Sequence, residues 1–288
     1  MGFRVNTNTD ALQAYYQLAK VNAETTKAQL RLSSGKRILN VGDDTSGFNV
    51  GTSLKGKVAV MKGAQNNIAS AKNLLATAEG ALLGMNDLLT KIEGKLSDAT
   101  NPTADRTALQ EDIRALSAEI HNILLNTKFN DSKILFSAAG QGYAFQVGES
   151  TDTLLIDYAS TLSSTGQGGY GDNISVSISS FQNVSATTLM STSGTESVQG
   201  LQTALVNLKS AVAGALGKIG NFSQRLDIKD ETLNVAIANA ESTISRLFDA
   251  DMAMEQLKAT RGSILAQAGT AMLAQLNASP QQVLQLFQ

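Results

Sequence analysis

The sequence predicts a mainly α-helical protein in which both halves of the chain contribute to a long antiparallel coiled-coil bundle, with a small β region in the middle. Two observations predict the helices: apolar residues recur at alternating steps of three and four residues over 61–96 and again over 201–250. This spacing keeps one face of a long helix against a partner. A third observation, the alternation of apolar and polar residues around 143–147, predicts strands between the two halves.

The first expected helix covers 8–34, where Thr9 or Asp10 can serve as the cap and Gly35 as the stop. Its apolar stripe is narrow and includes several small residues, so it buries little area on its own. A similar weak pattern occupies 251–278 at the other chain end. We expect these two helices to pair with each other and with further copies, and to order on assembly. The residues expected to carry self-assembly are Leu12, Tyr16, Leu30, Leu257, Ile264, Leu265, Met272, Leu273, Leu276, Val283, Leu284 and Leu286.

The stretch 38–47 between the first two helices is predicted to be a turn-rich connector. Asp43 and Asp44 stand together in it, and we interpret them as helix-capping and connector residues rather than as a catalytic acid and base. The next helix follows the pattern of 61–96. It must end before Pro102, because proline and the residue preceding it disfavour helix continuation, so a hairpin leads into the helix of 109–123.

The third long helix of the bundle is the most extended one. Its apolar pattern runs from Leu201 to Ala250 with only Lys229 and Thr243 polar. At about 1.5 Å per residue this one helix is expected to be roughly 75 Å long, which predicts a rod-shaped molecule. We expect the facing seams of the three long helices to form the core of this rod. The rod-core residues are Ile68, Leu75, Leu82, Leu89, Leu109, Ile113, Leu116, Leu205, Leu208, Ile219 and Leu226.

The segment from 134 to 192 has a different character. Tyr143, Phe145 and Val147 alternate with small or polar residues, and so do the apolar residues of 174–178, which predicts short half-buried strands. The expected domains are therefore a terminal-helix inner core, 1–44 plus 251–288, and an outer rod, 45–192 plus 193–250. No large variable outer domain is expected.

Composition limits the chemistry that the chain can perform. It has 288 residues, a formal net charge of −2, no Cys and one His, and therefore lacks the usual parts of a nucleophilic triad or metal cluster. The run 166–171 fits G-x-G-x-x-G but leads into a predicted strand rather than a helix, so we interpret it as a loop. We expect no catalytic, cofactor or metal site, no nucleic-acid partner and no membrane insertion.

Several sequence blocks resemble bacterial flagellins. The N-terminal half carries Gln29-Leu30-Arg31-Leu32-Ser33-Ser34-Gly35-Lys36-Arg37-Ile38, Asp43-Asp44-Thr45-Ser46-Gly47 and Thr77-Ala78-Glu79-Gly80-Ala81-Leu82. The C-terminal half carries Ile264-Leu265-Ala266-Gln267-Ala268-Gly269-Thr270-Ala271-Met272-Leu273-Ala274-Gln275 and Pro280-Gln281-Gln282-Val283-Leu284-Gln285-Leu286. These blocks occur in the family's order and cover about 1–135 and 200–288.

The resemblance implies a non-enzymatic subunit that polymerises with copies of itself into the extracellular flagellar filament and serves swimming motility. It further implies export by the flagellar type III apparatus with an export chaperone and without a cleaved signal peptide, and contact with the filament cap and hook-associated proteins. The main alternative is the related hook–filament junction protein. A soluble coiled-coil binding or adhesion module and an enzyme are further alternatives from other classes.

Overall fold

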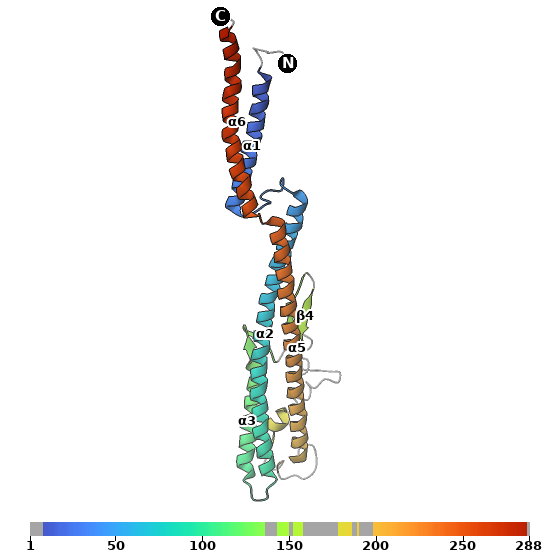
Figure 1. The fold of residues 1–288 in the computed structure, drawn as a ribbon. Coiled ribbons are helices and arrows are strands. Elements are labelled where there is room, and N and C mark those ends of the chain that lie inside the picture. The colour runs from blue at the N-terminus through green and yellow to red at the C-terminus, as the bar shows by residue number, and fades with distance from the viewer. Residues whose placement is uncertain are drawn as a thin grey trace. The chain divides into compact units, whose positions relative to one another are not determined.

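The computed structural model describes residues 8–135, 143–149, 152–157, 178–185, 189 and 198–286, with side chains described up to Ala278. The described part is dominated by helices, and short antiparallel strands occur in the middle of the chain, which confirms the predicted fold class (Figure 1). The chain divides into two compact units, 1–58 with 238–288, and 59–237. The first unit therefore combines segments from both ends of the chain, whereas the second is one continuous stretch.

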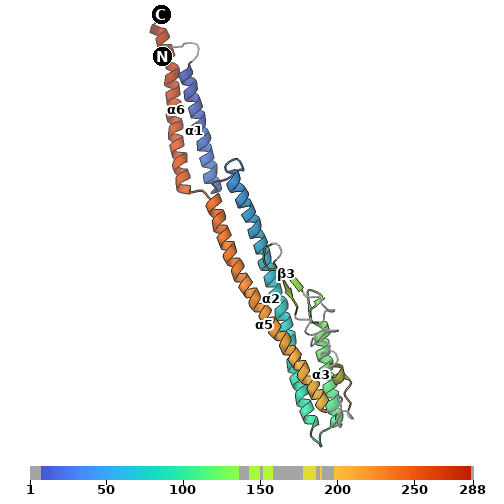
Figure 2. The same cartoon turned by 90° about the vertical axis from the view of Figure 1, so that its right-hand side faces the viewer.

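The first unit contains the helices of both chain ends. Helix α1 spans Thr9–Ser34 and helix α6 spans Met252–Leu286. The two lie side by side and run antiparallel, as both ribbon views show (Figures 1 and 2). The N-cap of α1 is Asn8, whose side chain accepts a hydrogen bond from Ala11 N at 3.0 Å. Gly35 ends the helix with φ +68°, a left-handed conformation that glycine adopts without a steric cost.

The second unit is built around three helices. Helix α2 spans Thr45–Ala99, α3 spans Arg106–Asn126 and α5 spans Val198–Phe248; the first residues of α2 and the last of α5 belong to the first unit. The hairpin between α2 and α3 contains Pro102, as predicted, and Asp105 caps α3 by accepting hydrogen bonds from Thr107 N and Ala108 N. Asp105 thereby supplies acceptors for two N–H groups that the helix itself cannot satisfy.

The seams of these helices form the core of the second unit. The structure buries Ile68, Leu75, Leu82, Leu89, Leu109, Ile113, Leu205, Leu208, Ile219 and Leu226, whereas Leu116 is half-buried. Ion pairs cross the outside of the seam, including Lys72 with Asp227 at 2.8 Å and Lys95 with Asp112 at 2.6 Å. Because these pairs are solvent-accessible, burial of the aliphatic seam contributes far more to stability than they do.

Two seams depart from the strict heptad spacing. In the second half of α3, Ser117 and Leu124 are buried, whereas the predicted Leu116 and Ile123, each one position earlier, are half-buried. Near the end of α5, Thr243 is exposed while the next residue, Ile244, is half-buried. A straight α-helix has 3.6 residues per turn, so its contact face drifts along a 3.5-residue pattern and moves to the next position after a few turns.

The strands form two separate antiparallel pairs. Strands β1 (Lys128–Phe129) and β2 (Ser132–Lys133) flank Asn130 and Asp131, whose φ angles of 49° and 62° suit a two-residue hairpin turn. Strands β3 (Tyr143–Gln146) and β4 (Thr153–Ile156) form the other pair, with Phe145 opposite Leu154. The strand predicted over 174–178 is wrong at its end, because Ile178 begins a helical segment of residues 178–182; residues 174–177 and the glycine-rich run 166–171 lie outside the described residues.

Candidate assembly surface

The contact between α1 and α6 is a seam of mostly small residues. The less exposed positions follow one another at heptad spacing on both helices and bring Ala and Gly of one helix against the other. The seam consists of Ala11, Ala14, Leu18, Val21, Thr25, Ala28 and Leu32 on α1, and of Glu255, Ala259, Gly262, Ala266, Gly269, Leu273 and Leu276 on α6.

Small side chains let the two helices approach closely. A Cβ atom added at Gly262 would overlap with the side-chain oxygen of Thr25, and one added at Gly269 would lie 3.0 Å from Leu18 Cδ1. At one end of the pair, Asn8 Nδ2 donates to Leu276 O at 3.0 Å. The seam therefore fixes how the helices pair, although it buries little apolar surface per residue.

Large apolar side chains of the same two helices remain exposed. Leu12, Tyr16 and Leu30 on α1 point away from the seam, with Leu12 55% exposed. We call the exposed apolar set the assembly face; its residues are Leu12, Tyr16, Leu30, Leu257, Ile264, Leu265 and Met272. An apolar set of this size on one helix pair indicates a surface that another protein chain covers.

The remaining residues predicted for self-assembly lie elsewhere. Leu273 and Leu276 are half-buried in the seam between α1 and α6. The side chains of Val283, Leu284 and Leu286 are outside the described part of the structure. Tyr15, Met252 and Met254 are also exposed apolar residues of these helices, and the sequence analysis missed them. The sequence does contain a signal for Tyr15. Neighbouring residues of a helix point in different directions, so Tyr15 and Tyr16 cannot both face one helix seam and at least one of them must be exposed.

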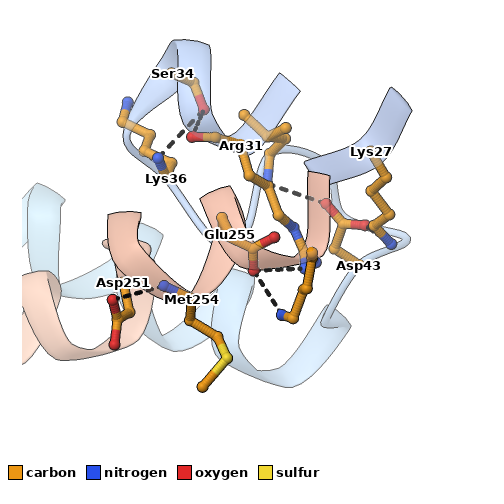
Figure 3. A network of polar contacts seen from close by, with 10 residues as sticks. Lys27, Arg31, Ser34, Lys36, Asp43, Asp251, Met254 and Glu255 are labelled. Atoms are coloured by element: carbon orange, nitrogen blue, oxygen red, sulfur yellow. Dashed lines mark hydrogen bonds and ion pairs between the residues drawn. The ribbon is translucent and has the colours of Figure 1, made fainter. Parts of the chain in front are cut away.

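A network of charged side chains links α1 to the connector and to α6 (Figure 3). Lys27 pairs with Asp43 at 2.5 Å, and Arg31 Nη1 lies 3.5 Å from Glu255 Oε1, which also pairs with Lys258 at 2.8 Å. Asp43 in addition accepts hydrogen bonds from the backbone N–H groups of Leu39 and Asn40. These contacts hold the connector against α1, in agreement with a structural role for Asp43.

The contacts of Asp43 perturb its acidity. The hydrogen bond from the Lys27 ammonium group, aided by those from the backbone N–H groups, lowers the pKa of Asp43 from 3.8 to about 2. A carboxyl whose pKa is lowered by folding stabilises the folded state above its unfolded pKa, and this contribution is lost as the pH falls toward the folded pKa. The stabilisation by Asp43 is therefore complete above about pH 4 and disappears between about pH 4 and pH 2.

Replacing Asp43 with asparagine tests this assignment. We expect the unmodified protein to unfold at a higher temperature than Asp43→Asn above pH 4, and the gap to shrink toward zero between pH 4 and pH 2. Thermal unfolding of the assembled protein, followed by circular dichroism at a series of pH values, measures the gap, because α1 is expected to order on assembly. A gap that is independent of pH would show that the carboxylate charge of Asp43 contributes nothing.

Phe248, the last residue of α5, lies where two connectors meet: residues 35–44 between α1 and α2, and residues 249–251 between α5 and α6. Arg37 N donates to Phe248 O at 2.6 Å, and Ala250 N donates to Gly35 O at 2.9 Å, so the two connectors pair through their backbones. The Phe248 ring occupies the space beside Gly51 that a Cβ would otherwise fill, and Lys55 Nζ lies 3.8 Å from the ring centre. Asp44 caps α2 by accepting from Gly47 N at 2.8 Å. The start of α2, the end of α1 and the start of α6 are thus fixed within the first unit.

A helix pair that buries small residues and exposes large apolar ones is typical of a subunit that assembles with other chains. Comparison with known proteins is consistent with this class. Residues 5–139 match the bacterial flagellin N-terminal helical region, and residues 198–287 match the bacterial flagellin C-terminal helical region.

Relatives match over nearly the whole chain. A flagellin of Halalkalibacterium halodurans is 30% identical over 98% of this chain and 99% of its own length. Flagellin of Bacillus subtilis and flagellar filament core protein flaB2 of Brachyspira hyodysenteriae are each 28% identical over 99% of both chains. The chain belongs to the bacterial flagellin family.

One solved structure shares the fold. A putative flagellar hook-associated protein from Vibrio parahaemolyticus superimposes with a TM-score of 0.57 at 17% identity, covering 72% of this chain and 100% of that chain. At this identity the likeness concerns the fold alone. Because the full-length relatives are flagellins and filament core proteins, the comparisons do not favour the junction-protein alternative.

Proposed function

We propose that the chain is a structural subunit that polymerises with copies of itself into the bacterial flagellar filament, and that the assembly face on α1 and α6 forms contacts between copies. Membership of the flagellin family supports the filament role. The observation that supports the location of the contacts is the exposure of Ile264, Leu12 and their neighbours on helices whose seam is filled by small residues. The role is mechanical and needs no catalytic residue.

The domain limits follow from the same proposal. Residues 1–44 with 251–288 form the inner core, in which the terminal helices of neighbouring copies meet. Residues 45–250 form the outer rod, whose buried aliphatic seams keep it folded independently of the polymer. Folding of the terminal helices is coupled to polymerisation, because the small-residue seam alone buries too little apolar area to hold them together.

The cellular route is part of the proposal. The subunit is exported through the flagellar type III apparatus with the help of an export chaperone, and it contacts the cap and hook-associated proteins at the two filament ends. It functions outside the cell in the filament. In the described part of the chain, no helix combines the length and apolar character that crossing a bilayer requires.

Seeded polymerisation tests the proposed function. Purified protein mixed with sheared filament fragments should grow filaments visible by electron microscopy and should gain helicity by circular dichroism. Protein that remains monomeric with unchanged helicity would contradict the filament role and would return the adhesion module to consideration.

An Ile264→Asp variant tests the assembly face itself. Ile264 is 60% exposed, so a charge there leaves the fold of the monomer intact. In a polymer the buried carboxylate would be costly to desolvate, and we expect filament yield to fall at least tenfold. Ile264→Val retains an apolar side chain and should polymerise nearly as the unmodified protein does. Equal yields from the two variants would place the contact surface elsewhere.

A further inference from the structure

A pocket between α1 and α6 contains two buried polar atoms that have no partner. It has a volume of about 450 Å³ and is lined by residues of both helices, among them Thr25, Arg31, Glu255, Gly262 and Leu265. Within the described part of the chain, Arg31 Nε and Glu255 Oε2 are buried side-chain atoms without a hydrogen bond. Figure 3 shows the pair from close by.

Glu255 has a buried carboxylate oxygen, Oε2, that lacks a hydrogen-bond donor. It is only 5% exposed, and its Oε1 is already engaged by Arg31 and Lys258. An unpaired carboxylate oxygen in such a place loses its hydration without gaining a hydrogen-bond donor, which destabilises the folded state. A group that donates a hydrogen bond to Oε2 would remove this penalty.

Arg31 has the opposite requirement, because its unpaired atom is a hydrogen-bond donor. Its Nε–H is a donor and requires an acceptor, while its guanidinium group shares the Glu255 carboxylate with Lys258. The group that fits the pocket therefore carries a donor and an acceptor close together, and an ionised carboxylate does not fit, because it has no hydrogen to donate to Glu255 Oε2. The carboxamide of Asn or Gln meets this description, since its NH₂ donates and its oxygen accepts.

The terminal helices themselves supply such groups. Their carboxylates are limited to Asp10, Glu24 and Glu255, whereas Asn and Gln are several times more frequent. The α1 amides Gln13, Gln17, Asn22 and Gln29 are exposed. Leu265 of the pocket lining belongs to the assembly face, so a copy that covers this face also reaches the pocket.

We propose that the pocket between α1 and α6 receives an Asn or Gln side chain from a second copy of this chain, whose carboxamide accepts from Arg31 Nε and donates to Glu255 Oε2. This inference rests on the proposed function and adds a polar anchor to the apolar assembly face. The apolar contact supplies most of the association free energy, and the amide fixes the register of one copy against the next, because the pocket accepts it in one position only.

The structure of the polymer at side-chain resolution is the direct test. We expect a carboxamide of a neighbouring copy within about 3 Å of both Arg31 Nε and Glu255 Oε2. A pocket that contains water alone, or in which these two atoms bond to each other, would overturn the inference while leaving the filament role standing. Failure of the unmodified protein to polymerise would instead overturn the proposed function.

The Arg31→Lys variant provides an independent readout. Lysine keeps the positive charge and can pair with Glu255, but it has no Nε–H to donate at the pocket. We expect the protein concentration needed for seeded polymerisation to rise about tenfold, as the loss of one hydrogen bond to a charged group predicts. Lys20→Arg is the matched control, since it exchanges the same two residue types at an exposed position of α1 outside the pocket lining and should polymerise at the original concentration.

A mutational cycle separates the pocket contact from general weakening of the helix pair. Replacing the neighbouring amide with alanine should raise the required concentration by a similar factor, and combining it with Arg31→Lys should add little further. Fully additive effects, or unchanged polymerisation of Arg31→Lys, would show that the pocket does not receive the amide.

Discussion

Replacing Gly262 with alanine should raise the protein concentration needed for filament growth at least tenfold. Alanine normally stabilises a helix relative to glycine by about 1 kcal/mol, so the expected direction is opposite to helix propensity. The reason is steric: the new Cβ would overlap with the Thr25 side-chain oxygen and would lie 3.0 Å from Thr25 Cβ. Thr25 is β-branched and its hydroxyl donates to Val21 O at 2.7 Å, so it cannot turn aside without losing that bond.

A compensating substitution is the control for this prediction. Thr25→Gly removes the atoms that the new Cβ meets, and the double variant should polymerise far better than Gly262→Ala alone. Gly63→Ala provides a second control, because a Cβ at Gly63 meets nothing within 4 Å and this variant should be no less stable to heat than the unmodified monomer. Wild-type polymerisation of Gly262→Ala would show that close approach of α1 and α6 is not required in the filament.

The long helices could be predicted from the sequence because their seams carry large aliphatic residues. Leu75, Leu82 and Leu89 stand at heptad spacing, and each contributes a large apolar area that only burial can remove from water. The hairpin after α2 could also be predicted from the sequence, since Pro102 prevents continuation of the helix. The drift of the seam in α3 and near the end of α5 could not be predicted, because it depends on how straight each helix is in the fold.

The seam between the terminal helices was harder to predict. The sequence analysis followed the large side chains Leu12, Tyr16 and Leu30, whereas the structure packs α6 against the neighbouring stripe that includes Ala11, Ala14 and Ala28. Burial area alone favours large residues, but two helices that approach closely need small ones between them. Alanine and glycine at three- and four-residue steps are common in helices and give no clear signal until the partner is known.

The polar part of the site could not be predicted at all. Arg31 and Glu255 belong to opposite chain ends, and no periodicity relates them. Asp43 was interpreted correctly as a connector residue, but its pairing with Lys27 required the reversal of the chain at Gly35. Contacts of this kind depend on tertiary structure. The periodicity of apolar residues can therefore predict which side of a helix is buried, but not which charged side chains of different segments form pairs.

Replacing Leu82 with alanine should lower the free energy of unfolding of the monomer by about 2–5 kcal/mol. Leu82 is 0% exposed at the middle of the α2 seam, and its removal leaves a cavity that the surrounding rigid helices cannot fill by collapse. Unfolding by urea, followed by circular dichroism, measures the change from the shift of the midpoint at constant slope.

Leu83, the residue next to Leu82, provides the matched control for the Leu82→Ala variant. Leu83 is 48% exposed on the same helix, so Leu83→Ala changes helix propensity in the same way but opens no cavity. We expect this variant to differ from the unmodified protein by about 0.5 kcal/mol or less. A large gap between two neighbouring leucines would show that the heptad position, and not the residue type, carries the stability of the rod. Similar losses at both positions would mean that the seam at Leu82 is loosely packed, and the coiled-coil interpretation of the second unit would have to be abandoned.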